Sequence, residues 1–319
     1  MAAIQLPWET RVARAGTQAR PYERFLLASQ RTRVTMNRQT IAAAALIAIG
    51  VLILYADVLT KLLLAWRTDD NYSHGFFIVP IAAYLAWERR DQLAAAPARP
   101  SSLGLLVVLA SAVVLAAGVL GAELFLTRVS LVGMLGGIVL FMFGWRHLRI
   151  LAFPLLFLLL MIPLPAIVFN KIAFPLQLLA SRAGEFALSS VDIPVLREGN
   201  VLVLANTSLE VAEACSGIRS LISLLTLGIV FGYLADSRGW VRTVVALSTI
   251  PVAVVSNGAR VAGTGIAAHR FGPAAAQGFF HEFSGWAVFI VAFLLMLGLQ
   301  RALVWIFPPA PPQPAVAVI

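Results

Sequence analysis

Eight stretches of this chain are apolar over a length that can cross a lipid bilayer, and this pattern limits the fold more than any other feature. They lie at residues 40–59, 72–87, 103–121, 124–145, 148–165, 216–234, 241–265 and 284–306. A membrane-spanning helix needs about 20 apolar residues, within a range of about 17–25. The strands of a membrane barrel would instead alternate apolar and polar residues. Because a helix satisfies its own backbone hydrogen bonds in lipid, the pattern predicts an all-α polytopic membrane protein with about eight transmembrane helices.

The composition excludes a water-soluble protein. Of the 319 residues, 60% are hydrophobic and 12% are charged, whereas soluble domains are about 45–50% apolar and about 25% charged. The net charge of +9 does not indicate nucleic-acid binding, because the basic residues lie mainly between the apolar runs. We expect membrane lipids, and no nucleic acid, as partners. A single cysteine excludes an internal disulfide and a multi-cysteine metal site, so we expect no metal and no other cofactor.

The distribution of lysine and arginine predicts the topology, since cytoplasmic loops of membrane proteins are enriched in both residue types. If the N-terminus lies inside, the inner segments hold fifteen of the 24 basic residues, seven of them before residue 40. Both termini are therefore expected in the cytoplasm. Residues 1–39 form the predicted basic N-terminal segment, 40–307 the membrane domain, and 308–319 a proline-rich tail.

The outer segment between the fifth and sixth apolar runs is too interrupted to be a simple span. Residues 166–188 resemble an interfacial amphipathic stretch. Further on, short apolar runs at 195–196 and 201–204 flank Gly199-Asn200, a pair typical of turns between strands. We expect a short outer-face β-hairpin that leads into the sixth transmembrane helix.

The only cysteine lies where this hairpin should pass into the sixth span, in the sequence AEACSGIR at 212–219. A thiol at a helix N-terminus is deprotonated more readily, because the helix dipole stabilises the thiolate. Arg219 is one turn after Cys215 and would lower the thiol pKa further. Ser216 and Gly217 offer backbone N–H groups to an oxyanion, and Glu213 is a candidate orienting residue. The alternative is a buried cysteine that acts as a small hydrophobic residue.

The seventh span carries an arginine close to its predicted outer end, in the sequence SNGAR at 256–260. A charged side chain at membrane depth is costly and usually faces a protein interior or a watery cavity. Asn257 and Arg260 share a helical face, so the amide can hold the guanidinium while the guanidinium holds an anion. The alternative is an interfacial arginine that reaches to the lipid headgroups.

A histidine opens the eighth span, in the sequence HEFSG at 281–285. Its ordinary pKa of about 6.5 suits proton transfer near neutral pH, although a solvated interfacial histidine is the alternative. The predicted topology places Cys215, Arg260 and His281 at the outer ends of three consecutive spans. A nucleophile, a cationic stabiliser and a proton shuttle are the groups that cysteine acyl transfer requires. His74, in the sequence YSHG at 72–75, is a further candidate for substrate contact.

These blocks, in this order, resemble the exosortase/archaeosortase family of membrane cysteine peptidase-transpeptidases. The resemblance rests on EACSG at 213–217, NGAR at 257–260, and His281 with Gly285, and YSHG at 72–75 is similar to the family's first-loop motif. It covers about 66–289. By this resemblance Cys215 is the nucleophile, and Arg260 and His281 are the catalytic arginine and histidine.

The resemblance also implies the substrates and the compartment. Bacterial members are thought to process exported proteins whose C-terminal sorting signal has a Pro-Glu-Pro motif, one transmembrane helix and a basic end, often alongside exopolysaccharide genes. We therefore expect a thiol peptidase-transpeptidase in the cell inner membrane, with its site facing the periplasm. Two alternatives stay open. One is a non-enzymatic export component for polysaccharide or lipid, and the other is a protease that uses water alone.

Overall fold

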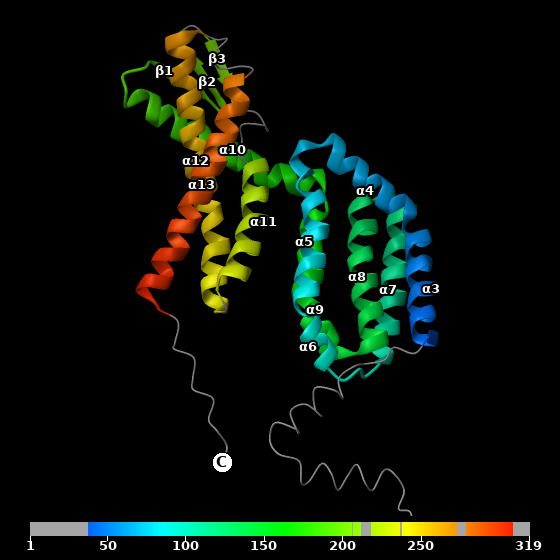
Figure 1. The fold of residues 1–319 in the computed structure, drawn as a ribbon. Helices are drawn as coiled ribbons and strands as arrows, with labels where there is room; N and C mark the ends of the chain where they lie inside the picture. The colour runs from blue at the N-terminus through cyan, green and yellow to red at the C-terminus, as the bar shows by residue number, and fades with distance from the viewer. Residues whose placement is uncertain (1–37, 206, 212–217, 237, 273–278, 309–319) are drawn as a thin grey trace, which may run out of the picture. The chain divides into compact units, whose positions relative to one another are not determined.

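The computed structural model describes residues 38–205, 207–211, 218–236, 238–272 and 279–308 (Figure 1). The chain divides into two compact units, the first from residues 1–64 and 76–162 and the second from 65–75 and 163–319. The elements before residue 163 are α3 (Arg38–Leu54), α4 (Ala56–Thr68), η1 (Asp70–Tyr72), α5 (Gly75–Glu88), α6 (Arg90–Ala95), α7 (Ser102–Leu120), α8 (Leu124–Phe143), α9 (Trp145–Phe157) and η2 (Leu158–Met161). Those that follow are α10 (Ala166–Ser189), β1 (Val195–Glu198), β2 (Val201–Leu204), β3 (Thr207–Glu210), α11 (Ile218–Ala235), α12 (Gly239–Phe271) and α13 (Phe279–Ile306).

The first unit is a helical bundle whose closest packing is between α7 and α8. A Cβ added to Gly137 would lie 2.9 Å from the backbone nitrogen of Val108, so the glycine lets the two backbones approach. The Tyr55 hydroxyl is fully buried and lies 3.1 Å from the Ser130 hydroxyl of α8. This polar contact joins α8 to the point where α3 and α4 meet in a bend of 64°.

The structure confirms a helical membrane protein but not the number of spans. Within the described residues, four helices are long and apolar enough to cross a membrane, namely α7, α8, α12 and the Gly285–Ile306 part of α13. The number rises to as many as six if each of two bent helix pairs is one span. Two other predicted spans correspond to α5, with 14 residues, and α11, with 18. The count of eight spans therefore stays a prediction.

The second unit contains a small antiparallel sheet in the order β1-β2-β3. Glu198 pairs with Val201, which leaves Gly199 and Asn200 as the predicted two-residue turn. Gly199 has a φ of +65°, as expected for a glycine at the first position of such a turn. The predicted hairpin is present, β3 extends it, and its location on the outer face of the membrane remains a prediction.

Two buried clusters hold the second unit together. In one, the sheet packs with α10 and α12 through Leu188, Leu202, Val211 and Val261. In the other, α11, α12 and α13 pack through side chains that include Leu224, Val245, Ala253, Ala292 and Met296. Figure 1 shows the sheet beside the C-terminal end of α12, away from the turn between α11 and α12. The segment 212–217 therefore connects the first cluster to the second.

Candidate functional site

Two glycines of α11 show how α11 and α12 are aligned. A Cβ on Gly232 would lie 3.5 Å from Val245, and one on Gly228 would meet Thr249. The two contacts are four residues apart in each helix and run in opposite directions, so the helices are antiparallel. Continued by ten residues, this alignment brings Ile218, the first residue of α11, level with Ala259. The start of α11 therefore lies beside the part of α12 that carries Arg260.

Arg260 also contacts the first part of α13. Its guanidinium carbon and Nη2 are each 3.8 Å from the position of a Cβ on Gly285, and its side chain is half-buried. Position 281 is four residues, or one helical turn, before Gly285 in the same helix. Arg260 thus lies between α12 and the first part of α13. Along the axis of α12 it is level with the first residue of α11.

The same segment of α12 is held on its other side by α10. A Cβ on Gly258 would come within 2.8 Å of the Cβ of Ala183, and one on Gly184 would come within 2.7 Å of Val261. Asn257, only 3% exposed, lies between Gly258 and the polar Ser256, which is also buried. Asn257 is thus buried in the wall of the site and takes part in further contacts of its own.

The hairpin turn holds the chain just before the segment that carries the cysteine. The Val211 N–H donates to the Asn200 carbonyl at 2.8 Å, and the Asn200 side-chain amide donates back to the Val211 carbonyl at 3.4 Å. Val211 itself is 2% exposed and belongs to the core of the sheet. Residues 212–217 are therefore joined to a fixed point at Val211 on one side and to α11 on the other.

The predicted first-loop motif, YSHG at 72–75, belongs to the second unit as well. Tyr72 accepts a hydrogen bond from the Leu164 N–H at 3.2 Å, and its ring lies 6.3 Å from that of Phe169 in α10. η1, which contains Tyr72, packs against α11. His74 is buried, with its ring 6.4 Å from that of Tyr72. The structure therefore brings the motif into contact with the helix that begins at Ile218.

Four of the predicted site residues, Glu213, Cys215, Ser216 and Gly217, lie outside the described residues. For Arg219 and His281 the structure describes the backbone, in the first turns of α11 and α13, but not the side chain. Their roles remain predictions.

Several residues at the site could not be found from local sequence patterns. Gly285 as the neighbour of Arg260, Asn200 as the anchor of Val211, and Trp66, whose indole packs on Gly75, are all defined by packing between distant segments. Among the described residues no group of three His, Cys, Asp or Glu side chains could hold a metal ion. The arrangement offers a half-buried arginine, whose charge suits a developing negative charge.

A comparison with family models gives one match, described as transmembrane exosortase (Exosortase_EpsH), over residues 66–298. No curated protein and no solved structure matches the chain. The matched segment begins at Trp66 and includes η1, α10, the sheet, α11, α12 and the Arg260–Gly285 contact. Since it covers well over half of the 319 residues, the chain belongs to the transmembrane exosortase family.

Proposed function

We propose that this protein is a thiol peptidase-transpeptidase that cleaves C-terminal sorting signals of exported membrane-anchored proteins. The observation that carries the proposal is the location of Arg260, whose guanidinium lies against Gly285 of α13 at the level where α11 begins. Membership of the exosortase family supports the same reaction.

Covalent geometry limits how far the thiol can lie from this arginine. Cys215 is three residues before Ile218, and three residues of extended chain span at most about 11 Å. Ile218 is level with Ala259, next to Arg260 in α12. The proposal therefore puts the cysteine at the same end of α11 as the residues level with the guanidinium. Because residues i and i+4 share a face of a helix, position 281 is on the face of α13 that carries Gly285, and the proposal assigns the proton transfer to His281.

The proposed reaction begins with the Cys215 thiolate, which the start of α11 and Arg219 would stabilise. The sulfur attacks the scissile carbonyl carbon, and Arg260, with the backbone N–H groups of Ser216 and Gly217, stabilises the oxyanion. The C–N bond then breaks, protonated His281 gives its proton to the leaving amine, and a thioester remains. An incoming amine or water, deprotonated by His281, releases the product.

The length of α12 supports a site near the membrane surface. Arg242 and Arg260 are 18 residues apart, which corresponds to about 27 Å along a helix, close to the hydrocarbon thickness of about 30 Å. If Arg242 lies at the inner boundary, as the distribution of basic residues predicts, Arg260 lies at the outer one. We therefore propose an inner-membrane protein with both termini in the cytoplasm and the site facing the periplasm.

The remaining predicted residues take supporting roles in this proposal. Asn257 is buried beside Gly258 and would hold the α12 segment that presents Arg260. His74 lies in the loop that packs on α11 through η1, where it would contact the substrate. Glu213 would orient the segment that carries the thiol.

The substitution Cys215→Ala tests the proposed reaction directly. It should leave a co-expressed substrate, a protein with a C-terminal motif, one hydrophobic span and a few arginines, at full length in the membrane fraction. The variant itself should insert normally, because alanine is tolerated wherever a small residue is. Normal processing by Cys215→Ala would refute the proposal.

Labelling of the thiol separates the enzyme from a non-enzymatic export component. A membrane-impermeant maleimide should label Cys215 from outside, and the rate should fall in His281→Ala but not in His269→Ala, an exposed histidine in the last turn of α12. An export component predicts no dependence on His281. Mass analysis of the product distinguishes a transpeptidase, which forms a new amide, from a protease that uses water alone.

A further inference from the structure

Three points at which α12 and α13 are level with one another are spaced by eleven residues in each helix. At one end the Arg238 guanidinium, just before α12, donates to the carbonyl of Phe307, just after α13. Thr249 is eleven residues after Arg238, and Met296 is eleven residues before Phe307. A Cβ added to Gly228 of α11 would meet the side chains of both. After the same step again, Arg260 contacts Gly285. Eleven residues make close to three helical turns, so the three contacts follow one face of each helix.

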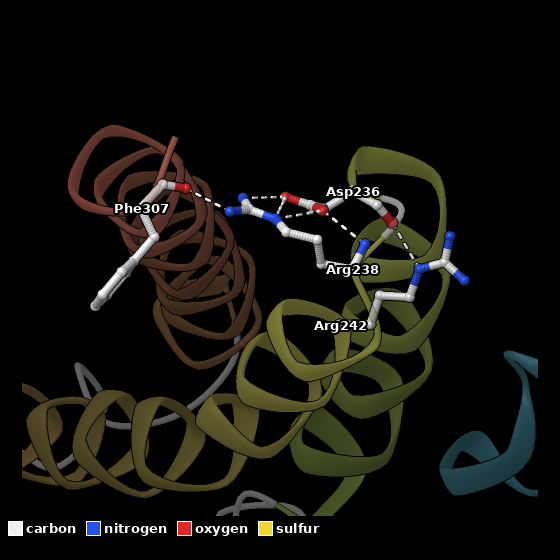
Figure 2. A network of polar contacts seen from close by, with 4 residues as sticks. All are labelled: Asp236, Arg238, Arg242 and Phe307. Carbon is white, nitrogen blue, oxygen red and sulfur yellow. Dashed lines mark hydrogen bonds and ion pairs between the residues drawn. The ribbon is translucent and has the colours of Figure 1, made fainter. Parts of the chain in front are cut away.

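The first of these contacts is a network of hydrogen bonds (Figure 2). The Asp236 carboxylate accepts from Arg238 Nε at 3.0 Å and from Nη2 at 2.6 Å, and from the Arg238 backbone N–H at 2.8 Å. Arg242 Nε donates to the Asp236 carbonyl at 2.6 Å, and the Trp240 and Phe307 rings meet edge to face at 5.3 Å. We call Asp236, Arg238 and Phe307 the clamp, because together they join the α11–α12 turn to the end of α13.

The clamp matters because α12 and α13 are anchored differently. The C-terminal half of α12 packs on α10 through Gly258 and Ala183. In the described part of the chain, the helices that α13 contacts over more than a few residues are α11 and α12. The buried cluster among these helices consists of apolar side chains such as Ala292 and Met296, which resist axial sliding less specifically than hydrogen bonds with fixed geometry. Helix α13 contains no proline, so a displacement at Phe307 is transmitted along it to Gly285.

We propose that the clamp fixes the axial position of α13, and that Arg238 is thereby a positioning residue for the Arg260 end of the helices. The link between that end and catalysis rests on the proposed function, whereas the axial position itself does not. A shift by one residue along α13 is about 1.5 Å. It would move Gly285, and position 281 with it, relative to Arg260.

A distance between two spin labels tests the axial position without reference to activity. Phe271 of α12 and Leu294 of α13 are 77% and 57% exposed, and by the eleven-residue alignment they are separated along the axis by 20 residues, about 30 Å. Cysteines at these two positions, in a full-length Cys215→Ser chain, give a distance that changes directly as α13 slides. We expect Arg238→Ala to shift the mean distance by at least about 1.5 Å. Arg301→Ala, which removes an exposed arginine of α13 outside the clamp, should not.

An unchanged distance in Arg238→Ala would overturn the proposal. Should that variant fail to insert, Arg238→Met keeps a long unbranched side chain without an N–H donor and leads to the same expected shift. The exchanged pair Asp236→Arg with Arg238→Asp restores opposite charges, but a carboxylate at 238 cannot donate to the Phe307 carbonyl. The shift should therefore persist in the exchanged pair, and recovery of the original distance would rule out the bond to Phe307 as its cause.

The effect on the site is measured separately, in the chain with Cys215 intact. In Arg238→Ala we expect maleimide labelling of Cys215 to slow by about 3–10-fold at neutral pH, with its pH profile displaced. A normal labelling rate together with a shifted label distance would refute the positioning role of Arg238 and leave the proposed reaction to be judged by Cys215→Ala. Normal processing by Cys215→Ala together with a shifted distance would refute the proposed reaction and leave the clamp.

Discussion

Arg238 at the start of α12 and Arg260, about three turns before its end, both reach toward α13, and the two guanidinium groups have different neighbours. Arg238 is bonded to both carboxylate oxygens of Asp236 and to the Phe307 carbonyl. Arg260 lies against Gly285 in a part of α12 where Gly258 permits close packing on α10. Hydrogen bonds of fixed geometry therefore define the surroundings of Arg238, and glycines on α12 and α13 allow close packing around Arg260.

This difference separates the expected effects of mutation. At the clamp, a substitution acts by removing donors and acceptors, and its consequence for the site is indirect. At the Arg260 end, a substitution acts through charge or volume directly beside the proposed reacting atoms. We therefore expect the largest effects on processing at Arg260 and Gly285 and the smallest at the clamp.

Loss of the Arg260 charge should have the largest effect. Removing a group that stabilises an oxyanion typically lowers the rate by about 10²–10³-fold, so we expect Arg260→Gln to lower substrate processing by this factor. Arg260→Lys should recover little of it, since an ammonium lacks the planar fork of a guanidinium. Arg270→Gln changes an exposed arginine at the end of the same helix and should process normally. Equal rates in Arg260→Gln and Arg270→Gln would remove Arg260 from the site.

Features that depend on local sequence were predicted well. The apolar run at 103–121 became α7 (Ser102–Leu120), because a long continuous apolar stretch in a membrane has no alternative to a helix. The turn at Gly199-Asn200 was found from its residue types alone, since glycine adopts positive φ at little cost. The site residues were predicted by motif, and their location at corresponding helix ends, which follows from the order of the spans, stays a prediction.

Features that depend on distant contacts were not predicted. The strand β3 pairs with β2 through a polar sequence, TSLE, that resembles a loop when read alone. Helix α12 continues six residues beyond its predicted end at 265, through His269 and Arg270, because a helix that leaves the hydrocarbon can carry charged residues. The clamp joins residues 69 positions apart in the chain, and no local pattern reports such a contact.

A large side chain in place of Gly285 should have the second largest effect on substrate processing. A Cβ there would be 3.8 Å from the Arg260 guanidinium, an ordinary van der Waals distance, so Gly285→Ala should process within about 3-fold of the wild type. The longer side chain in Gly285→Leu must displace the guanidinium. Since misplacement by about 1 Å can cost about 10²-fold, we expect a loss of that order in a processing time course. Equal activities in the two variants would show that the space beside Gly285 is not needed.

Loss of the side-chain hydrogen bond from Asn200 to the Val211 carbonyl should have a smaller effect, because this bond is long at 3.4 Å. We expect Asn200→Ala to lose about 0.5–1.5 kcal/mol of stability and to slow maleimide labelling of Cys215 a few-fold. Asn200→Asp should behave similarly, since an ionised carboxylate cannot donate to the Val211 carbonyl. Ser208→Ala, at an exposed position of β3, serves as the control. Labelling at the wild-type rate in both Asn200 variants would show that the turn does not position the cysteine segment.

Lowering the pH should have the smallest effect on the clamp. Hydrogen bonds from Arg238 lower the pKa of Asp236 to about 2, below its ordinary 3.8. A carboxyl whose pKa is lower in the folded state contributes stability above its unfolded pKa and loses it as the pH falls through the folded value. The contribution should therefore be complete from pH 8 down to about 4, and it should disappear only near pH 2.

The label distance between positions 271 and 294 measures this dependence, and we expect it to stay constant between pH 8 and pH 5. In Arg238→Gln the main cause of the low pKa is removed, so Asp236 should titrate near the ordinary carboxyl value. A change in distance between pH 8 and pH 5 in the wild type, absent from Asp236→Asn, would mean that Arg238 does not hold the carboxylate ionised. The contrast between the hydrogen-bonded start of α12 and the glycine-rich surroundings of Arg260 would then have to be abandoned.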